Sequence, residues 1–395
     1  MTDSSNSPEV SEPPAKKPRI SNDDLYRNST QFELWSFTPD NLKEAKRKAN
    51  EKGIQVSKEK FDLAYAQAKQ DHPDVFQQYA DELNESMRSF LTPEEESTYL
   101  DFYIQNITTT CNFFKMPTQV RLTAASFFKK FYLVNSVMEF HPKNVLYTCI
   151  FLAAKSENYF ISIESYVKAL KGTDAAHILD LEFIVLRSLK FTLLVHHPIR
   201  PLYGFFLDFQ AVLLHPEQVI YDVNVDTLGK LYNEAKEWLN KYFMVSDVAF
   251  LFTPPQIALA AMYDTDKRIT ERYLKRKFLK DEPKLDSIKE EPKEEEEAAA
   301  AATNGEEGGG GAEATEEEQP KAKSSNREQY ESLVKSIRRC IRIAKQSQVA
   351  DREASKEIDK KCFFALNPKK LIDKRIKRLT SGAADGTKET TAEPK

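Results

Sequence analysis

Apolar residues along most of the chain recur with the spacing of a helix face, and they do not alternate with polar residues as they would in a strand. This spacing is clearest from about residue 93 to 280, and it resumes at about 327. Glycine, which weakens helices, is scarce at 11 of 395 residues. The pattern predicts an all-α protein.

A first run of helices starts at the stretch TPEE, residues 92–95. Thr92 can cap a helix, Pro93 suits the first turn, and Glu95 completes a capping box. Helices with short linkers are predicted at roughly 93–114, 118–134, 142–156, 162–171 and 175–190. They form a predicted first five-helix unit, 92–192.

A second run follows a break at His197-Pro198. Its helices are predicted at roughly 199–213, 224–242, 254–265 and 269–279, with a fifth resuming at about 327. The second unit is therefore predicted to comprise residues 193–280 plus 326–346. The segment between these two parts, 281–325, is acidic, with 15 acidic against 3 basic residues over 281–320. Such a composition cannot bury enough apolar surface to fold, so we expect a disordered insert.

The two units contain a matching central segment. HPKNVLYTCIF, residues 141–151, aligns with TPPQIALAAMY, residues 253–263, and each begins with a polar residue and proline. The stretch VLYTCIFLAA, residues 145–154, is apolar on every face before it ends at Lys155. A helix that is apolar all round must be enclosed by other helices. We therefore expect each unit to surround its third helix with the other four.

Further helices are predicted on both sides of the two units. After a disordered leader, 1–23, an N-terminal helical extension is expected over 24–91, with one helix starting at Thr38-Pro39 and stopping at Gly53. Residues 57–90 have a weaker helical pattern. A C-terminal helix is expected within 347–372, with Asn367 and Pro368 as its stop signals, followed by a disordered tail, 373–395.

The composition excludes several classes of protein. No cysteine lies in a CxxC pair, and the histidines are not clustered near cysteines, so neither zinc nor a disulfide framework is expected. The N-terminus has no apolar signal region, and the longest apolar run is too short to span a bilayer. No Gly-rich phosphate loop, GxSxG or kinase catalytic set is present, and the six histidines are interpreted as structural. We expect an intracellular protein that is not an enzyme and needs no cofactor or metal.

A short basic cluster lies in the leader. In PAKKPR, residues 14–19, Lys16, Lys17 and Arg19 stand between prolines. This arrangement is similar to a nuclear import signal, so nuclear localisation is expected. The alternative is a chance basic patch in a disordered tail.

FFKKFYLVNSVMEFHPKNVLYTCIFLAAK, residues 127–155, resembles the second and third helices of a cyclin box. The stretches 25–42, 189–209 and 250–261 also resemble the cyclin family, and within it the regulatory subunits of the CDK-activating kinase. The resemblance implies two tandem five-helix cyclin repeats. The long segment 50–88 and the acidic insert depart from the family pattern. The first helix of the first unit also lacks the Met-Arg-x-x-Leu motif of cell-cycle cyclins.

The resemblance also implies a function. A cyclin of this kind binds and activates a cyclin-dependent kinase, together with a MAT-type assembly factor, and is associated with the TFIIH core. The implied substrates of the kinase are activation loops of other kinases and the C-terminal domain of RNA polymerase II. Cyclins use a lysine at the end of the third helix and a glutamate in the fifth to hold the kinase. Lys155 and Glu182 match these positions.

Two alternatives remain open on the residues alone, a cyclin-fold general transcription factor that binds DNA and a helical scaffold without a kinase partner. Residues 93–280 carry 21 basic and 20 acidic residues, so no direct nucleic-acid partner is expected for the protein, and no membrane contact is expected either. Basic residues do gather at 267–280, and residues 327–378 carry 16 basic against 7 acidic. The simpler interpretation of these basic stretches is a solvated helix face.

Overall fold

The computed structural model describes residues 26–170, 172–214, 223–279, 325–346 and 352–386. All regular structure within these ranges is helical, which confirms the predicted all-α class. The described chain divides into two compact units. Unit 1 comprises Met1–His197, Met244–Phe252 and Ser347–Lys395, and unit 2 comprises Pro198–Phe243 and Thr253–Gln346.

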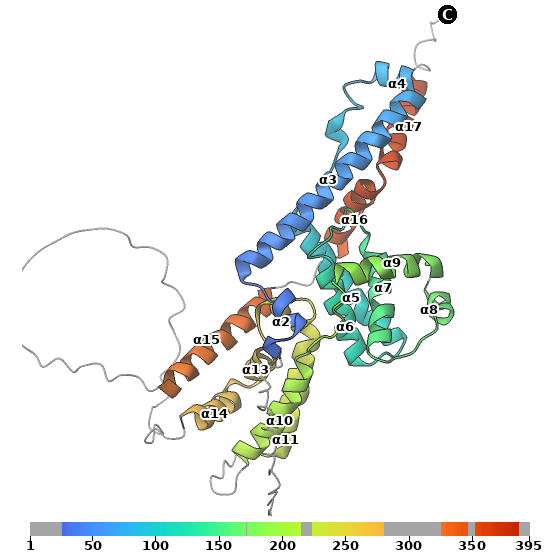
Figure 1. The fold of residues 1–395 in the computed structure, drawn as a ribbon. Coiled ribbons are helices and arrows are strands. Elements are labelled where there is room, and N and C mark those ends of the chain that lie inside the picture. The colour runs from blue at the N-terminus through green and yellow to red at the C-terminus, as the bar shows by residue number, and fades with distance from the viewer. Residues whose placement is uncertain (1–25, 171, 215–222, 280–324, 347–351, 387–395) are drawn as a thin grey trace, which may run out of the picture. The chain divides into compact units, whose positions relative to one another are not determined.

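Five helices of unit 1 form a bundle around α7 (Figure 1). These helices are α5 (Pro93–Phe113), α6 (Thr118–Phe131), α7 (Pro142–Ser156), α8 (Ile163–Ala169) and α9 (Ala175–Ser188). Helix α7 packs against α5, α6 and α9, and its residues from Val145 to Ala154 are buried, apart from the half-buried Tyr147. The helix start predicted at Thr92 is present, because Thr92 and Glu95 form a reciprocal capping box. The position of α7 explains why its sequence is apolar on every face.

Unit 2 is arranged in the same way around α13. Its helices are α10 (Ile199–Leu213), α11 (Val225–Trp238), α13 (Pro254–Thr265), α14 (Lys267–Phe278) and α15 (Ser325–Gln346). Helix α13 packs against the other four, and Ile257 through Tyr263 are all buried. A short π-helical segment, η2 (Leu239–Phe243), continues α11. The central small residues of α13 allow the surrounding helices to approach closely.

The N-terminal extension contains α2 (Thr30–Trp35), α3 (Pro39–Asp71), α4 (Pro73–Gln78) and η1 (Glu85–Met87). The predicted stop at Gly53 is wrong, because α3 continues through it for a further 18 residues. A Cβ atom on Gly53 would lie 2.2 Å from Cβ of Ser136. Gly53 is therefore required for close packing of α3 on the bundle and not for helix termination.

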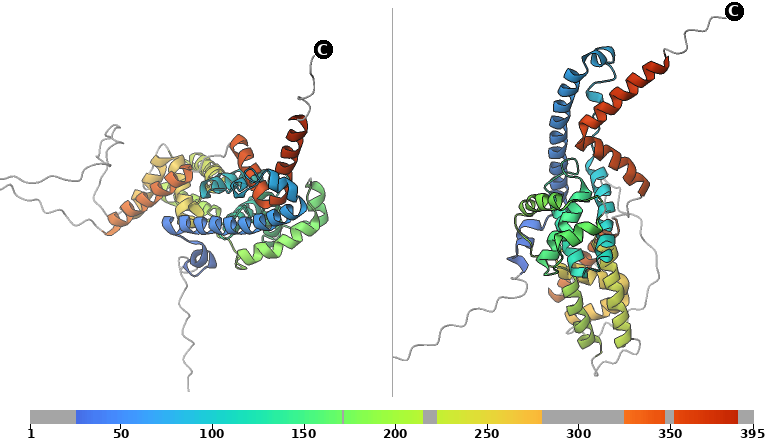
Figure 2. Two further views of the ribbon diagram at one scale, coloured as in Figure 1. Left: turned by 90° about the horizontal axis from the view of Figure 1, so that it is seen from above. Right: turned by 90° about the vertical axis from the view of Figure 1, so that its right-hand side faces the viewer.

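The C-terminal part contains α16 (Arg352–Leu366) and α17 (Pro368–Gly386). Asn367 and Pro368 do end α16, but Pro368 also starts α17, so the tail predicted as disordered from 373 is helical to residue 386. The chain bends between the two helices (Figure 2). Helix α17 packs along α3, where Ile372 and Ile376 share a core with Phe61. Packing against the apolar face of α3 therefore stabilises a helix in residues that the sequence predicted to be disordered.

A short segment that follows η2 in sequence belongs to unit 1. It contains α12 (Val248–Leu251), and Phe250 packs there with Trp35, Leu42 and Leu133. The backbone N–H of Phe37 also donates to the carbonyl oxygen of Phe250 at 2.8 Å.

Some expectations fall outside the described ranges. They are the leader 1–23 with Lys16, Lys17 and Arg19, and the acidic insert apart from Ser325. Among the helices that the structure does describe, none has the length and apolarity of a membrane span. The same part of the chain contains no group of three or more histidine, cysteine or acidic residues placed to hold a metal ion.

Candidate functional site

The two residues that the sequence singled out, Lys155 and Glu182, are brought together in unit 1. Lys155 lies in the last turn of α7, and Glu182 lies in the middle of α9. The Lys155 ammonium donates to Oε1 of Glu182, and the two groups form an ion pair. The Lys155 side chain is 43% exposed and that of Glu182 is 16% exposed. The pair is thus accessible to a partner from the lysine side.

Lys155 is also held by its own helix. Its Nζ lies 4.7 Å from the centre of the Phe151 ring, one turn earlier on α7. The positive charge at the C-terminal end of α7 is favourable for the helix dipole. These contacts hold the lysine near Glu182 before any partner binds.

Glu157, two residues after Lys155, belongs to a different network. The hydroxyl of Thr123 donates to Oε1 of Glu157 at 2.6 Å and lies 2.7 Å from Nε2 of His197. Because the hydroxyl has one proton, the ring of His197 must donate to it. Burial lowers the pKa of His197 to about 3, so the ring is neutral. Glu157 therefore connects the end of α7 to Thr123 of α6 and is not part of the Lys155–Glu182 pair.

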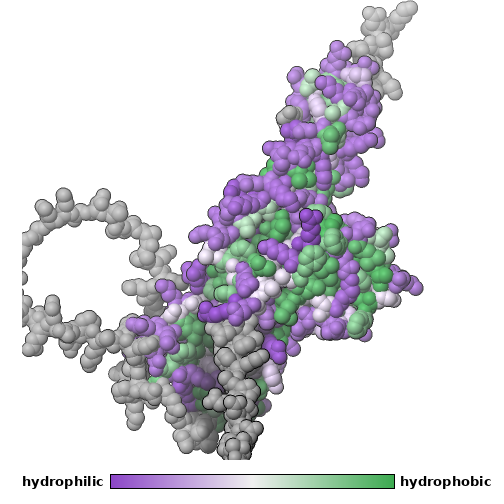
Figure 3. Space-filling view, viewed as in Figure 1, coloured by the Kyte–Doolittle hydropathy of each residue, from purple (hydrophilic) through white to green (hydrophobic). Residues whose placement is uncertain are grey.

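Large apolar side chains are exposed on the elements next to this pair. Leu179 and Phe183 lie one turn apart on α9, and Phe191 follows that helix with its ring centre 6.3 Å from that of Phe183. The exposed fractions are 46% for Leu179, 62% for Phe183 and 63% for Phe191. Figure 3 shows hydrophobic surface gathered over the part of unit 1 where Figure 1 labels α7 and α9. Exposed apolar residues grouped in this way mark an interaction surface.

Sequence reasoning located the charged pair but missed much of this apolar surface. Apolar residues stand on both sides of Glu182 in the sequence, and the structure divides these between two faces. Ile178, Leu181 and Val185 are buried, whereas Leu179 and Phe183 are exposed. Phe191 was not recognised as part of a surface. One feature of the sequence could have indicated this surface: α9 contains more apolar residues than a single buried face of a helix requires.

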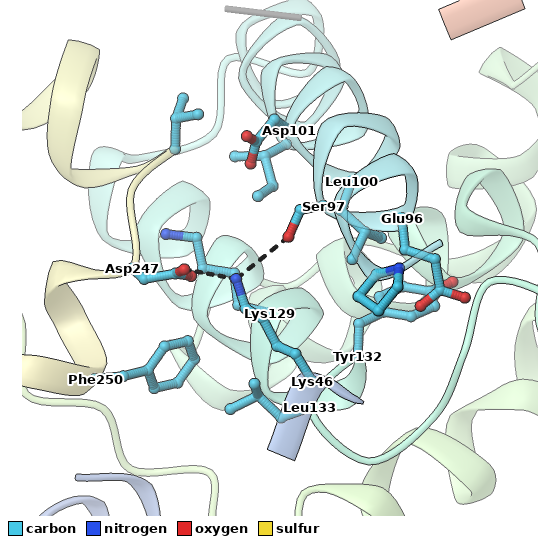
Figure 4. Close-up of a pocket in the computed structure, with 13 residues that line it drawn as sticks. Lys46, Glu96, Ser97, Leu100, Asp101, Lys129, Tyr132, Leu133, Asp247 and Phe250 are labelled. Atoms are coloured by element: carbon cyan, nitrogen blue, oxygen red, sulfur yellow. Dashed lines mark hydrogen bonds and ion pairs between the residues drawn. The ribbon is translucent and has the colours of Figure 1, made fainter. Parts of the chain in front are cut away.

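A second cluster of charges lines a small pocket of about 40 Å³ in unit 1 (Figure 4). Lys46 pairs with Asp247 at 2.6 Å, and Lys129 donates to the carbonyl oxygen of Ser246 at 2.5 Å. Burial raises the pKa of Asp101 to about 7 and lowers that of Lys129 to about 8. These groups fasten the segment Met244–Phe252 to α3 and α6, so we interpret the pocket as structural.

Comparison with known proteins identifies the fold that carries the Lys155–Glu182 surface. The model of the cyclin N-terminal domain matches residues 64–194, and the model of the cyclin C-terminal domain matches residues 197–345. Together the two matches contain both five-helix bundles. The pseudo-repeat around α7 and α13 is therefore the tandem cyclin repeat that the sequence resemblance predicted.

Chains of similar structure are found in two solved complexes. A chain of the CAK complex from Chaetomium thermophilum bound to ATP-gamma-S has a TM-score of 0.61 at 22% identity, over 95% of this chain and 99% of that one. This likeness supports the fold. A chain of the yeast TFIIK complex of Kin28, Ccl1 and Tfb3 has a TM-score of 0.53 at 30% identity, over 81% of this chain and all of that one.

Relatives of known name agree with these structural matches. Cyclin CCL1 of Saccharomyces cerevisiae is 39% identical over 280 residues, which cover 71% of this chain and 67% of the relative. Cyclin-H of Xenopus laevis is 31% identical over 255 residues, which cover 62% of this chain and 69% of the relative. With both cyclin domains matched and these identities sustained over two thirds of its relatives, the chain belongs to the cyclin family, in its cyclin H group.

Proposed function

We propose that this chain is the regulatory subunit that binds and activates a cyclin-dependent kinase. The observation that carries the proposal is the Lys155–Glu182 ion pair beside the exposed side chains of Leu179, Phe183 and Phe191. A yeast complex that contains a similar chain is described as Kin28, Ccl1 and Tfb3, and a second similar chain comes from a CAK complex. We infer that the present chain has an equivalent kinase partner and itself supplies no catalytic group.

The physical mechanism is a shift in the population of kinase conformations. A free kinase samples arrangements in which its mobile helix is misplaced and the Lys–Glu pair that positions the ATP phosphates is broken. A cyclin that binds the ordered arrangement more tightly shifts the equilibrium by that difference in affinity and no more. The surface formed by α7 and α9 would bind the mobile helix in its active position.

Lys155 and Glu182 would act as a polar anchor within an apolar surround. On binding, the ammonium would donate to backbone carbonyl groups of the kinase, and the carboxylate would accept from backbone N–H groups. Phe183 and Phe191 would exclude water from these hydrogen bonds, which strengthens them in a medium of low dielectric constant. Because the two side chains already hold each other, less side-chain entropy is lost when the kinase binds.

The same reasoning extends to a larger assembly. We propose a MAT-type assembly factor as the third subunit, corresponding to Tfb3 in the yeast complex, and association with the TFIIH core. The proposed substrates are activation loops of other kinases and the C-terminal domain of RNA polymerase II. The location would be nuclear, with Lys16, Lys17 and Arg19 as the import signal.

The direct test is reconstitution. The purified chain is mixed with the kinase subunit that co-purifies with it, and phosphate transfer to a C-terminal-domain peptide is measured. We expect activity at least tenfold above that of the kinase alone, because the cyclin stabilises the active position of the mobile helix. A kinase that binds the chain but is not stimulated, or no kinase among the co-purifying proteins, would contradict the proposal.

A further inference from the structure

The exposed face of α17 is strongly basic. Helix α17 carries six basic and two acidic residues, and five of the basic ones are exposed. These five residues, which we call the α17 basic face, are Lys369, Lys370, Lys374, Lys377 and Arg378. Lys370, Lys374, Lys377 and Arg378 lie within about a third of the circumference of the helix, and Lys369 lies beside them in the first turn.

The packing of α17 on α3 sets the orientation of this face. Ile372 and Ile376 are buried in the core shared with α3, and Arg375 on the same flank pairs with Glu82 at 3.2 Å. Lys370, Lys374 and Lys377 follow the i, i+4, i+7 spacing of one helix face, so they line the side turned away from that core. The packing of Ile372 and Ile376 on α3 therefore orients these three lysines toward solvent.

Within the described part of the chain, none of the four lysines of the α17 basic face has a carboxylate within ion-pair distance. The acidic residue nearest in sequence, Asp373, is half-buried. A solvated helix face ordinarily mixes charges of both signs. An uncompensated row of cations attracts a polyanion.

Two aromatic rings of α16 lie beside these lysines. Nζ of Lys370 is 5.2 Å from the ring centre of Phe363, and Nζ of Lys374 is 5.6 Å from that of Phe364. Phe363 is 39% exposed. The surface therefore combines cations with an accessible aromatic ring, the combination that binds the backbone and the bases of single-stranded nucleic acid.

We propose that the α17 basic face is a binding site for single-stranded nucleic acid, DNA or RNA. The lysines would contact successive phosphates, and Phe363 would stack on a base. Lysines on an open helix face offer point charges without a pocket, so binding would be independent of base sequence. A phosphopeptide is less favoured, because its recognition typically uses the paired donors of arginine, and four of the five cations are lysines.

This inference differs from the expectation drawn from residues 93–280. That expectation, of no direct nucleic-acid contact, covered the whole chain. It rested on a near-neutral charge over those helices and on the interpretation of the basic residues within 327–378 as a solvated helix face. The α17 basic face lies within 327–378, on a helix that continues beyond the end expected at residue 372. The proposed site is also separate from the α7–α9 surface and does not depend on kinase binding.

The test compares two variants with the same charge change. Binding of a fluorescent oligothymidylate to the full chain, alone and with its kinase, is followed by anisotropy between about 50 and 200 mM salt. The triple variant Lys370→Glu, Lys374→Glu, Lys377→Glu removes the proposed site. The control Lys43→Glu, Lys230→Glu, Lys335→Glu alters three exposed lysines spread over α3, α11 and α15.

The first triple variant should bind at least about tenfold more weakly, and the slope of log affinity against log salt should fall by about 2, because three phosphate contacts are lost. The control should bind within about twofold of the unaltered chain. Phe363→Ala, which leaves the charge unchanged, should weaken binding by about fivefold or more through lost stacking. Unchanged helicity by circular dichroism verifies that α17 is still folded.

Four results would overturn the proposal. The first is equal binding by the two triple variants, and the second is an unchanged salt slope in the first. The third is tighter binding of poly-glutamate than of oligothymidylate at equal charge, since that would identify the face as a site for acidic polypeptides. The fourth result is normal binding by Phe363→Ala. Because Phe363 lies on α16, this variant still tests the site if the triple variant loses the helicity of α17.

Discussion

At the scale of single residues, the protein buries several charged groups, and each has a structural reason. Glu96 is 7% exposed, and it accepts a hydrogen bond from the hydroxyl of Ser136. Lys130 is 2% exposed, and its Nζ lies 5.4 Å from the ring centre of Trp35. Burial disfavours the charged form of each group. It raises the pKa of Glu96 and lowers that of Lys130.

The Glu96 carboxyl should make stability depend on pH. Burial raises its pKa to about 7, and the hydrogen bond from Ser136 opposes that shift only in part. Because the pKa in the folded state lies above the unfolded value, this stabilising contribution is complete below about pH 4 and is lost as pH rises to about 7. Glu96→Gln keeps the acceptor oxygen without the charge. It should raise the free energy of unfolding at pH 8 by up to about 3 kcal/mol and have little effect near pH 4.5.

Urea unfolding at the two pH values measures this difference. The exposed Glu94, two residues earlier on α5, provides the matched control, and Glu94→Gln should change stability by less than about 0.5 kcal/mol at either pH. If Glu96→Gln were equally stabilising at pH 4.5 and pH 8, titration of Glu96 would not be the cause.

The sequence could identify Lys155 and Glu182 only because they match a family pattern. Periodicity alone did not tell which side of α9 would be buried, since apolar residues surround Glu182 on both sides. Burial of Ile178 and Val185 depends on their contacts with the rest of the bundle, which are distant in sequence. The exposed partners of the site, Phe183 and Phe191, follow from that choice and could not be predicted before it.

At the scale of helices, the local start signals were reliable, and one of the two stop signals was not. The predicted starts at Pro93, Pro142 and Pro254 all coincide with the helices of the structure. Each has a preceding residue that can cap the helix, and these interactions are local. Asn367 and Pro368 were predicted as stops and do end α16, although Pro368 also begins α17. Gly53 was predicted as a stop, yet α3 continues through it, because a tertiary contact outweighs the local preference of glycine.

Gly53 gives a test of that interpretation. In an exposed helix interior, glycine to alanine stabilises by roughly 0.5–1 kcal/mol. At Gly53 the added methyl group would lie 2.2 Å from Cβ of Ser136. Either α3 or the turn after α6 that contains Ser136 must therefore shift. Gly53→Ala should therefore lower the free energy of unfolding by about 1–3 kcal/mol.

Gly229 in α11 is the matched control, because beyond the neighbouring residues and backbone of its own helix nothing lies within 4 Å of the position that its Cβ would occupy. Gly229→Ala should stabilise the protein, so the two substitutions should shift the melting temperature in opposite directions. Stabilisation by both would mean that Gly53 is not needed for close packing.

At the scale of the whole molecule, two five-helix bundles bury their central helices, and unit 1 adds the paired helices α3 and α17. The repeat could be predicted because both central helices are apolar all round and begin at proline. The pairing of α3 with α17 could not be predicted, because these segments lie about 300 residues apart in the sequence. The apolar face of each helix is buried only by contact with the other. Two exposed surfaces stand out among the described residues of unit 1, the apolar one on α9 and the basic one on α17.

The central claim is that the α7–α9 surface activates a kinase, and the most direct measurement is kinase activity with the double variant Lys155→Ala, Glu182→Ala. We expect both the stimulation of kinase activity and the affinity for the kinase to fall by about tenfold or more. The free energy of unfolding should change by less than about 1 kcal/mol, because the pair is partly exposed. Lys43→Ala with Glu234→Ala, two exposed residues elsewhere, should stimulate normally. Full kinase binding and stimulation by the Lys155→Ala, Glu182→Ala protein would contradict the claim.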